Sequence, residues 1–391
     1  MAGDKLKLFA VTAPGLKPFA IRELADLGCF PLTSDSNRPA LSGPPGESEA
    51  GGVEFEGSLI ELYRANLHMR TASRVLLRLD EFYAAAFAEL RKKAARLPWE
   101  KYIMPGAPVT LRVTCHKSRL YHSGGVAERV AGAIADRLGY PILVQPFDEN
   151  TETNPPQLVV VRLVRDLCTI SLDSSGAALH RRGYRKATAK APIRETLAAG
   201  MLLAAGWDKK SPLIDPFCGS GTIPIEAAML ACNIPPGRAR RFSFMDWPGF
   251  DQRSWQALLQ EAEAGVYNEP PAIKGSDRDA GAIVAAQTNA GRAGVADAIE
   301  FSRRAVSDIQ PEGTGWIVTN PPYGVRVSSG KDLRNLYAQL GNILHAGCPG
   351  WRVAIISSQE QLLNSIGLRF ETKISMVNGG VNVKLALGQV K

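Results

Sequence analysis

The sequence predicts an α/β protein of two or three domains, and three observations support this fold class. The chain has 391 residues, whereas an ordinary domain has roughly 150. Hydrophobic residues make up 45% of the chain and charged residues 21%, which is typical of a globular protein. From Pro192 onward, expected strands and helices alternate strictly. Such alternation predicts a mostly parallel sheet with helices on both faces.

The first half predicts two small α/β units, since apolar spacing typical of helices follows β-rich segments. The expected elements of the first unit are a strand over 7–12, a helix over 16–27, a loop rich in Ser, Pro and Gly over 33–52, an edge strand over 52–57 and a helix from its N-cap Ser58 to Met69. Those of the second are strand 74–79, helix 84–96, strand 109–115, helix 123–138, and strands 157–164 and 167–172.

The second half predicts a seven-stranded sheet with an antiparallel edge. The expected elements are helix 193–205, strand 212–216, helix 222–233, an insertion over 234–271, strand 272–277, helix 279–293, strands 298–302 and 315–319, helix 332–346, strand 351–357, and strands 370–377 and 381–387. The last two strands flank Asn378-Gly379-Gly380, a sequence that favours a tight hairpin turn. Because a hairpin reverses the chain, it adds antiparallel character to the sheet.

Several classes of protein are excluded by composition. No run of about 18 apolar residues is present, so we expect no membrane span. Residues 1–7 lack the long apolar core of a signal peptide. The six cysteines form no CxxC pair, which argues against a zinc site or a disulfide scaffold. We therefore expect a cytoplasmic protein without a bound metal.

The basic surplus is concentrated in one part of the chain. The formal net charge is +8. Residues 1–100 are balanced, whereas residues 101–190 carry 13 Lys and Arg against 7 Asp and Glu. A basic block of this kind suits a polyanion such as nucleic acid, although a basic solvated surface would look the same.

The strongest local signal is a strand that runs into a glycine-rich turn, Leu213-Ile-Asp-Pro-Phe-Cys-Gly-Ser-Gly-Thr222. Glycines let the backbone approach a ligand closely at a helix N-terminus. A dinucleotide fingerprint would need a third glycine at position 224, where Pro stands. Asp215 would also repel a pyrophosphate. The Asp215 carboxylate suits a ligand that carries an ammonium and a sulfonium. The alternative for the whole segment is a strand-to-helix turn that binds no ligand.

Two further acids follow the next strands. Asp277 comes at the end of strand 272–277, where a carboxylate can accept both hydroxyls of a ribose. A helix N-cap is the alternative for this residue. Asp308 follows strand 298–302 and could accept from an adenine amino group, or it could be a solvated loop acid.

The segment Asn320-Pro-Pro-Tyr323 indicates the reaction class. It ends the buried strand 315–319, and neither proline carries an N–H that would compete for nearby carbonyls. The Asn320 side-chain oxygen and the Pro321 carbonyl can accept from a planar amino group, while the Tyr323 ring stacks on the ring that bears it. This geometry suits the NH2 of a base or an amide. The alternative is a proline-rich turn that has no role in binding.

These motifs resemble a known family. Residues 192–391 look like a class I S-adenosylmethionine-dependent methyltransferase domain with a Rossmann-like sheet. The connector Leu179–Arg185 and the following 191–197 are similar to the segment that precedes this domain in THUMP-containing RNA guanine-N2 methyltransferases. The resemblance implies a ferredoxin-like segment over 1–66, an RNA-binding THUMP domain over 67–172 and a connector over 173–191.

The resemblance also implies the cofactor and the site residues. S-adenosylmethionine would contact Thr196, Asp215, Pro216, Phe217, Cys218, Gly219, Ser220, Gly221, Asp277, Arg278, Asp308 and Asn320. The catalytic set would be Asn320, Pro321, Pro322 and Tyr323. With one methyltransferase domain, the implied reaction is one methylation of a guanosine N2 amine in RNA. We expect 23S ribosomal RNA first and transfer RNA second.

The expected RNA contacts lie in two basic segments. They are Lys117, Arg119 and His122 after strand 109–115, and Arg181, Arg182, Arg185 and Lys186 in the connector. Solvated surface charge is the alternative for each of them. Three other functions stay open: an RNA adenine-N6 methyltransferase, a protein glutamine methyltransferase and a catalytically silent RNA-binding protein.

Overall fold

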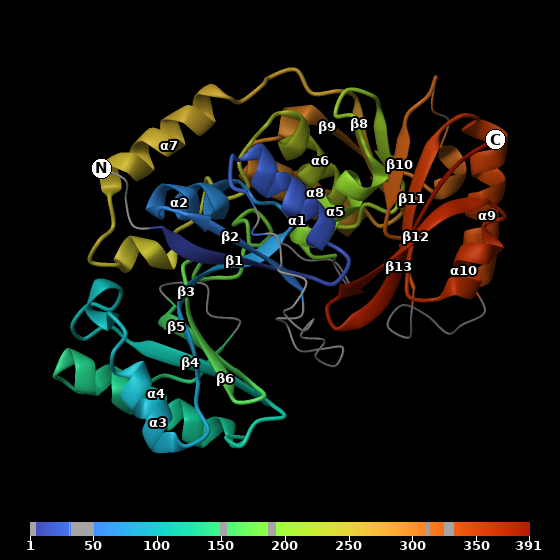
Figure 1. Cartoon of the computed structure of the whole chain (residues 1–391). Helices are drawn as coiled ribbons and strands as arrows, with labels where there is room; N and C mark the ends of the chain where they lie inside the picture. The colour runs from blue at the N-terminus through green and yellow to red at the C-terminus, as the bar shows by residue number, and fades with distance from the viewer. Residues whose placement is uncertain are drawn as a thin grey trace. The chain divides into compact units, whose positions relative to one another are not determined.

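The computed structural model describes residues 5–30, 32, 51–148, 155–186, 193–309, 311, 313–323 and 332–391 (Figure 1). Most of the expected loop 33–52 lies outside these residues. The chain forms two compact units. Unit 1 comprises residues 1–12, 20–179 and 240–260, and unit 2 comprises 13–19, 180–239 and 261–391.

Unit 1 contains one six-stranded sheet, where the sequence predicts two separate α/β units. Its strands are β1 (Leu6–Thr12), β2 (Gly52–Gly57), β3 (Ala72–Tyr83), β4 (Val109–His116), β5 (Gln157–Val164) and β6 (Leu167–Asp173), in the order β2-β1-β3-β6-β5-β4. The 12-residue β3 joins the halves, since it pairs with β1 from Ala72 to Arg78 and with β6 from Leu76 to Tyr83. Strand β2 lies at an edge, as its alternating pattern predicts.

The helices of unit 1 are α1 (Lys17–Asp26), α2 (Leu59–His68), α3 (Phe87–Ala94) and α4 (Ser123–Leu138). Helix α1 begins in unit 2 and continues into unit 1. The predicted N-cap Ser58 is confirmed, because its hydroxyl accepts from the Ile60 N–H while Glu61 accepts from the Ser58 N–H.

Part of the expected insertion belongs to unit 1. Residues 240–260, which include most of α7 (Gln252–Ala264), supply aromatic side chains to its core. Phe244 stacks on Tyr63 with the ring centroids 4.4 Å apart, and Trp255 meets the edge of both rings. Aromatic contacts of this geometry add to the stabilisation that burial alone provides. The segment is therefore a structural part of unit 1.

Unit 2 contains the predicted seven-stranded sheet. Its strands are β7 (Leu213–Asp215), β8 (Ile273–Asp277), β9 (Ile299–Arg303), β10 (Trp316–Thr319), β11 (Arg352–Ser357), β12 (Phe370–Asn378) and β13 (Val381–Gln389), in the order β12-β13-β11-β10-β7-β8-β9. All adjacent pairs are parallel except the two that involve β13. The mostly parallel sheet with an antiparallel terminal hairpin is confirmed.

Helices cover both faces of this sheet. They are α5 (Glu195–Ala205), α6 (Thr222–Ala231), α8 (Ala280–Ala293), α9 (Asp332–Gly347) and α10 (Glu360–Ser365). Two hydrophobic cores lie on the two faces of the sheet, and neighbouring residues of β10 contribute to different ones. Val318 packs with α5, α6 and α8, whereas Ile317 packs with α9 and α10. Alternate side chains of a strand point to opposite faces, so both faces are buried. No helix in the described part of the chain has the length and apolarity needed to cross a membrane.

Candidate active site

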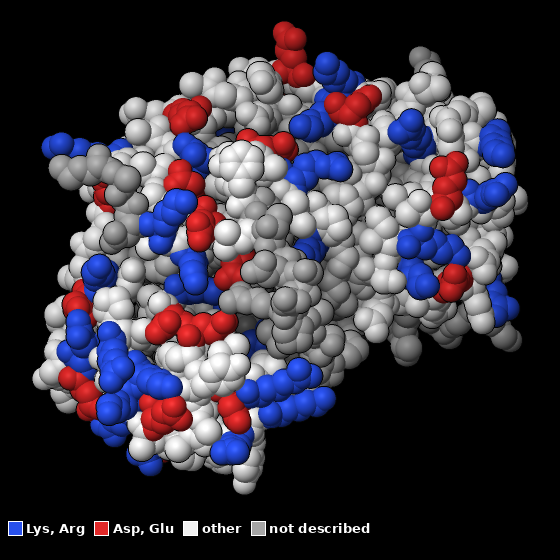
Figure 2. All heavy atoms as spheres, viewed as in Figure 1, with Lys and Arg blue, Asp and Glu red and all other residues white. Residues whose placement is uncertain are grey.

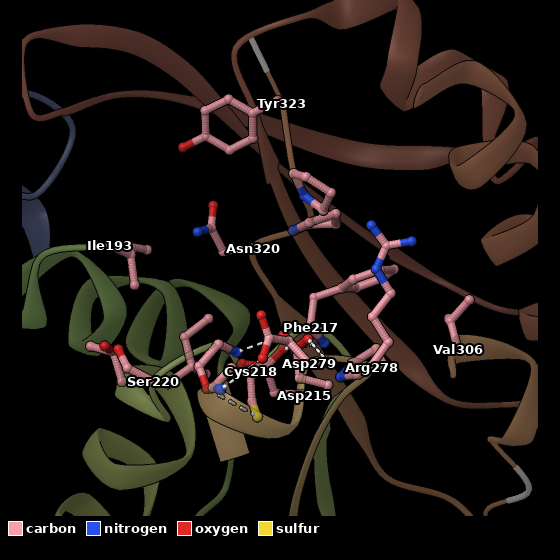
Figure 3. A pocket seen from close by; sticks show the side chains of 18 of the residues that line it. Ile193, Asp215, Phe217, Cys218, Ser220, Arg278, Asp279, Val306, Asn320 and Tyr323 are labelled. Atoms are coloured by element: carbon pink, nitrogen blue, oxygen red, sulfur yellow. Dashed lines mark hydrogen bonds between the residues drawn. The ribbon is translucent and has the colours of Figure 1, made fainter. Parts of the chain in front are cut away.

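Unit 2 holds a cavity of about 1060 Å³, which is lined by residues that follow β7, β8, β10 and β11. The carboxyl ends of parallel strands are the usual ligand site of open α/β sheets. Figure 3 shows Asp215, Phe217 and Cys218 on one side of the cavity and Asn320 and Tyr323 on the other. Ligand pockets in proteins are typically roughly 300–1,000 Å³, so this cavity lies at the upper end of the usual range.

The glycine-rich turn forms one wall. Asp215 ends β7, and its carboxylate is buried with 1% of its surface exposed. It accepts from the Thr319 hydroxyl at 2.6 Å and from the Phe217 N–H at 3.2 Å. Burial raises the pKa of Asp215 to about 7, and the charge of Asp277 adds to the shift. A cationic ligand group would offset this penalty.

The turn requires glycine where the chain enters α6. Gly221 has φ +84°, and a Cβ built on it would lie 2.9 Å from the Ala286 side chain. The close packing of Gly221 against α8 leaves the preceding residues 215–220 facing the cavity. Gly221 itself is not among the lining residues; its observed role is to shape the turn, and its contact with the cofactor stays a prediction.

Asp277 ties the turn to the next strand. Its two carboxylate oxygens accept from the Gly219 N–H and the Asp279 N–H, each at 3.0 Å. It lines the cavity together with Arg278 and Asp279. Each carboxylate oxygen has a second lone pair, so Asp277 retains acceptor capacity for ribose hydroxyls.

The Asn320–Tyr323 segment forms the opposite wall. All four residues line the cavity. The Asn320 side-chain oxygen is buried, and no partner donates to it within the described residues. A buried acceptor without a donor is costly unless a ligand supplies one. This wall therefore suits a ligand with an amino group.

Two predicted cofactor contacts do not reach the cavity. Asp308 is exposed, and its carboxylate accepts from the Ala305 N–H and the Ser307 hydroxyl, which closes its own short turn. Val306 and Ser307 line the cavity instead. Thr196 is buried in the first turn of α5 and is likewise not a lining residue. Neither residue is among those that line the cavity, and their contacts with the cofactor stay predictions.

The connector supplies internal ion pairs where the sequence predicts RNA contacts. Arg182 is 3% exposed and pairs with Glu226 of α6 at 3.2 Å. The Tyr184 hydroxyl donates to the same carboxylate at 3.0 Å. The prediction that Arg182 binds phosphate is wrong, because a buried guanidinium held by a buried carboxylate is not available to a polyanion.

Arg185 is engaged in a similar way. It pairs with Glu195 at 3.1 Å and donates to the Ile193 carbonyl at 2.6 Å. Ile193 lines the cavity, although its apolar side chain gave no sequence signal. Arg185 thus braces a cavity wall, which corrects its expected RNA role. In the rest of the connector Arg181 is partly buried and Lys186 is exposed, and their RNA contacts stay predictions.

The loop between β4 and α4 in unit 1 carries exposed basic residues, and its RNA contacts stay predictions. Lys117 and Arg119 are exposed, and the neighbouring Tyr121 has 82% of its surface exposed. Arg119 lies 3.9 Å from Asp166. His122 is different, since its Nδ1 accepts from the Gly125 N–H at 2.9 Å and so caps α4. The Nδ1 of His122 is therefore already used by α4, and only its Nε2 remains for an RNA contact.

Much of the other basic charge in unit 1 is paired. Figure 2 shows Lys and Arg mixed with acidic side chains where Figure 1 draws α3, α4 and β4. Arg91 pairs with Asp136 at 2.7 Å and Arg137 with Glu100 at 2.6 Å. These pairs make the helical face a less favourable polyanion site than the 117–121 loop.

Comparison with known proteins identifies the family of the chain. Residues 182–386 match the family model described as the RMKL-like methyltransferase domain. The chain belongs to this family. Residues 7–76 match the RlmL ferredoxin-like domain and residues 84–173 match the THUMP domain. The family resemblance of the sequence and its α/β methyltransferase fold are thereby confirmed.

Two curated relatives illustrate the similarity. A putative RNA methyltransferase of Synechocystis is 35% identical over 95% of this chain and 94% of its own length. Ribosomal RNA large subunit methyltransferase K/L of Methylococcus capsulatus is 37% identical over 97% of this chain. The chain spans about half the length of the K/L relatives that it matches.

Two solved structures share the whole fold. SMU.472, a putative methyltransferase complexed with SAH, is 27% identical with a TM-score of 0.85 over 99% of this chain and 98% of that one. A predicted N6-adenine-specific DNA methylase of Listeria monocytogenes is 34% identical with a TM-score of 0.85 over 99% of this chain and 97% of that one.

Proposed function

We propose that this protein transfers a methyl group from S-adenosylmethionine to the exocyclic N2 amine of a guanosine in RNA. The observation that carries the proposal is the buried oxygen of Asn320, which has no hydrogen-bond donor among the described residues and lies across one cavity from Asp215. A site that pairs an amine acceptor with a carboxylate suited to a cation fits methylation of an amino group.

The cofactor half is formed by the turn 215–220 and by Asp277. Asp215 has the buried negative charge that an ammonium and a sulfonium would stabilise, and Asp277 would accept from the ribose. When bound, S-adenosylmethionine supplies a methyl group that its sulfonium has already activated. The residues of this chain therefore have to bind and align rather than activate.

The amine half is formed by Asn320, Pro321 and Tyr323. The lone pair of guanine N2 is delocalised into the ring, which makes the amine a poor nucleophile. Two hydrogen bonds, to the Asn320 side-chain oxygen and to the Pro321 carbonyl, would orient the amine and favour its tetrahedral form as it attacks. The amine proton leaves after transfer, so no strong base is needed. No histidine is among the described residues that line the cavity.

The base has to leave its stack to reach such a cavity. The THUMP match and the exposed 117–121 loop support RNA as the substrate. The names of the K/L relatives favour large-subunit ribosomal RNA over transfer RNA. An adenine N6 amine would fit the same two acceptors, and the Listeria structure carries a name of that kind.

The decisive experiment identifies the methylated nucleoside. The purified protein is incubated with methyl-labelled S-adenosylmethionine and with ribosomal or transfer RNA from cells that lack its gene. We expect label in N2-methylguanosine from large-subunit ribosomal RNA, and none with the Asn320→Ala variant. Label in N6-methyladenosine or in protein would overturn the guanine assignment. An unlabelled RNA pool with folded, cofactor-binding protein would refute RNA methylation.

A further inference from the structure

The turn of the terminal hairpin reaches the amine half of the cavity. Asn378, the last residue of β12, lines the cavity together with Gly379 and Val381. Its side-chain amide donates to the Tyr323 hydroxyl at 3.1 Å. The hairpin and the Asn320–Tyr323 segment are 55 residues apart in sequence, so this hydrogen bond joins two otherwise separate walls.

Asn378 is held rigidly by the hairpin. It pairs with Val381 at the end of the ladder, and Val377 pairs with Asn382 behind it. The two intervening glycines have φ of +56° and +84°, the conformation that a two-residue hairpin turn of matching twist needs. Because ladder and turn both fix its backbone, the Asn378 amide is a stable anchor for a neighbouring side chain.

Tyr323 needs such an anchor if its ring is to orient a base. The ring is only partly buried and packs at the margin of both cores of unit 2. Pro321 and Pro322 stiffen the backbone before it, but they do not fix the rotation of its side chain. A hydrogen bond at the far end of the ring restricts that rotation.

We propose that Asn378 is a positioning residue for the target base, because it fixes the direction in which the Tyr323 side chain points and so the place of its ring beside Asn320. This inference rests on the proposed methyl transfer. A base stacked on a fixed ring presents its amine to the Asn320 oxygen in one orientation. On a ring that swings, the same base binds in several orientations, and a misplacement of about 1 Å can cost on the order of a hundredfold in rate.

The test compares two asparagines of the same hairpin. Asn378→Ala removes the donor to Tyr323, and Asn382→Ala removes an exposed amide that does not line the cavity. We expect Asn378→Ala to lower the single-turnover methyl-transfer rate at saturating RNA by at least about tenfold. Its affinity for S-adenosylhomocysteine should stay within about twofold of wild type, and Asn382→Ala should match wild type in both measurements.

A double-mutant cycle separates positioning from a general loss of structure. Tyr323→Phe keeps the ring but lacks the hydroxyl, so Asn378→Ala should lose nothing further in that background. Asn378→Asp should recover part of the rate, because the Tyr323 hydroxyl can donate to a carboxylate. A wild-type rate in Asn378→Ala, or an equal loss with and without the Tyr323 hydroxyl, would overturn the proposal.

A measurement without turnover keeps this inference distinct from the proposed function. In protein labelled with 13C at the tyrosine Cζ, the Tyr323 resonance is assigned by its absence in Tyr323→Phe. It should shift in Asn378→Ala and not in Asn382→Ala, and an unmoved resonance would refute the contact. A second outcome is that the resonance shifts in Asn378→Ala while the wild-type protein methylates no RNA. This result would confirm the contact but overturn both the proposed function and the positioning role.

Discussion

Cofactor binding should release a proton from Asp215. The pKa of this buried carboxyl is raised to about 7 in the unliganded protein. A bound ammonium beside it should return the pKa towards its ordinary value of about 4. Affinity should then fall by about tenfold per pH unit below the unliganded pKa, which amounts to about 25-fold, or ~1.9 kcal/mol, between about pH 7.5 and about pH 5.5.

Calorimetry with S-adenosylhomocysteine measures this linkage directly. At about pH 6, titrations in buffers of different ionisation heat should report release of about 0.9 proton. Asp215→Asn should flatten the pH dependence. Thr319→Val should move the fall in affinity to higher pH, because the Thr319 hydroxyl donates to the carboxylate and lowers its pKa. Affinity that is independent of pH, with no proton released, would refute the reasoning.

The raised pKa of Asp215 has the opposite effect on the stability of the unliganded protein, which should decrease as the pH rises. The folded-state pKa lies above the unfolded one, so the folded protein binds the proton more tightly. The contribution of Asp215 to the free energy of unfolding is therefore present below about pH 4 and is lost as the pH rises through about 7.

Four other changes test other parts of the molecule. Asn320→Ala should lower the methyl-transfer rate by at least about a hundredfold while sparing S-adenosylhomocysteine binding, whereas a near-normal rate would contradict the clamp. Asp277→Ala should weaken S-adenosylhomocysteine binding by about 1–3 kcal/mol in calorimetry, and unchanged affinity would show that Asp277 does not hold the ribose. Reversal of Lys117 and Arg119 together should reduce the salt slope of RNA binding by about one unit per lost contact, so an unchanged slope would exclude this loop. Arg182→Met should lower the free energy of unfolding by about 3–5 kcal/mol in urea because it strands a buried carboxylate, and a loss well below that would contradict the buried pair.

Local patterns predicted the parts of the fold that local physics determines. The strand ends at Asp215 and Asp277 and the hairpin turn after Asn378 were predicted because apolar runs, glycines and acids mark them directly. The merging of two units into one sheet was not predicted. It depends on which strands pair with the two halves of β3, and strand partners carry no local signal.

The connector shows why charge alone misleads. Arg182 lies in a basic run that is typical of a surface, and its partner Glu226 is 44 residues away. One signal was available: helix α6 is apolar around its whole circumference, yet it contains Glu226. An acid in a helix that is buried on every side needs a buried donor, and a nearby arginine is the natural partner. Asp308 gave no comparable signal, because only the tertiary fold decides which loop residue faces the cavity.

The exchange of segments between the two units has a consequence for folding during synthesis. Unit 1 lacks Phe244 and Trp255 until residues 240–260 have been made, which is about 80 residues after Leu179. At about 5–20 residues per second, the ribosome needs roughly 4–16 s to supply them. During that interval the Tyr63 ring of the nascent chain lacks the contacts with Phe244 and Trp255 that bury it in the folded protein. Domains in series usually fold one after another, the amino-terminal one first. Here we expect unit 1 to be completed only late in translation, because its core needs residues 240–260.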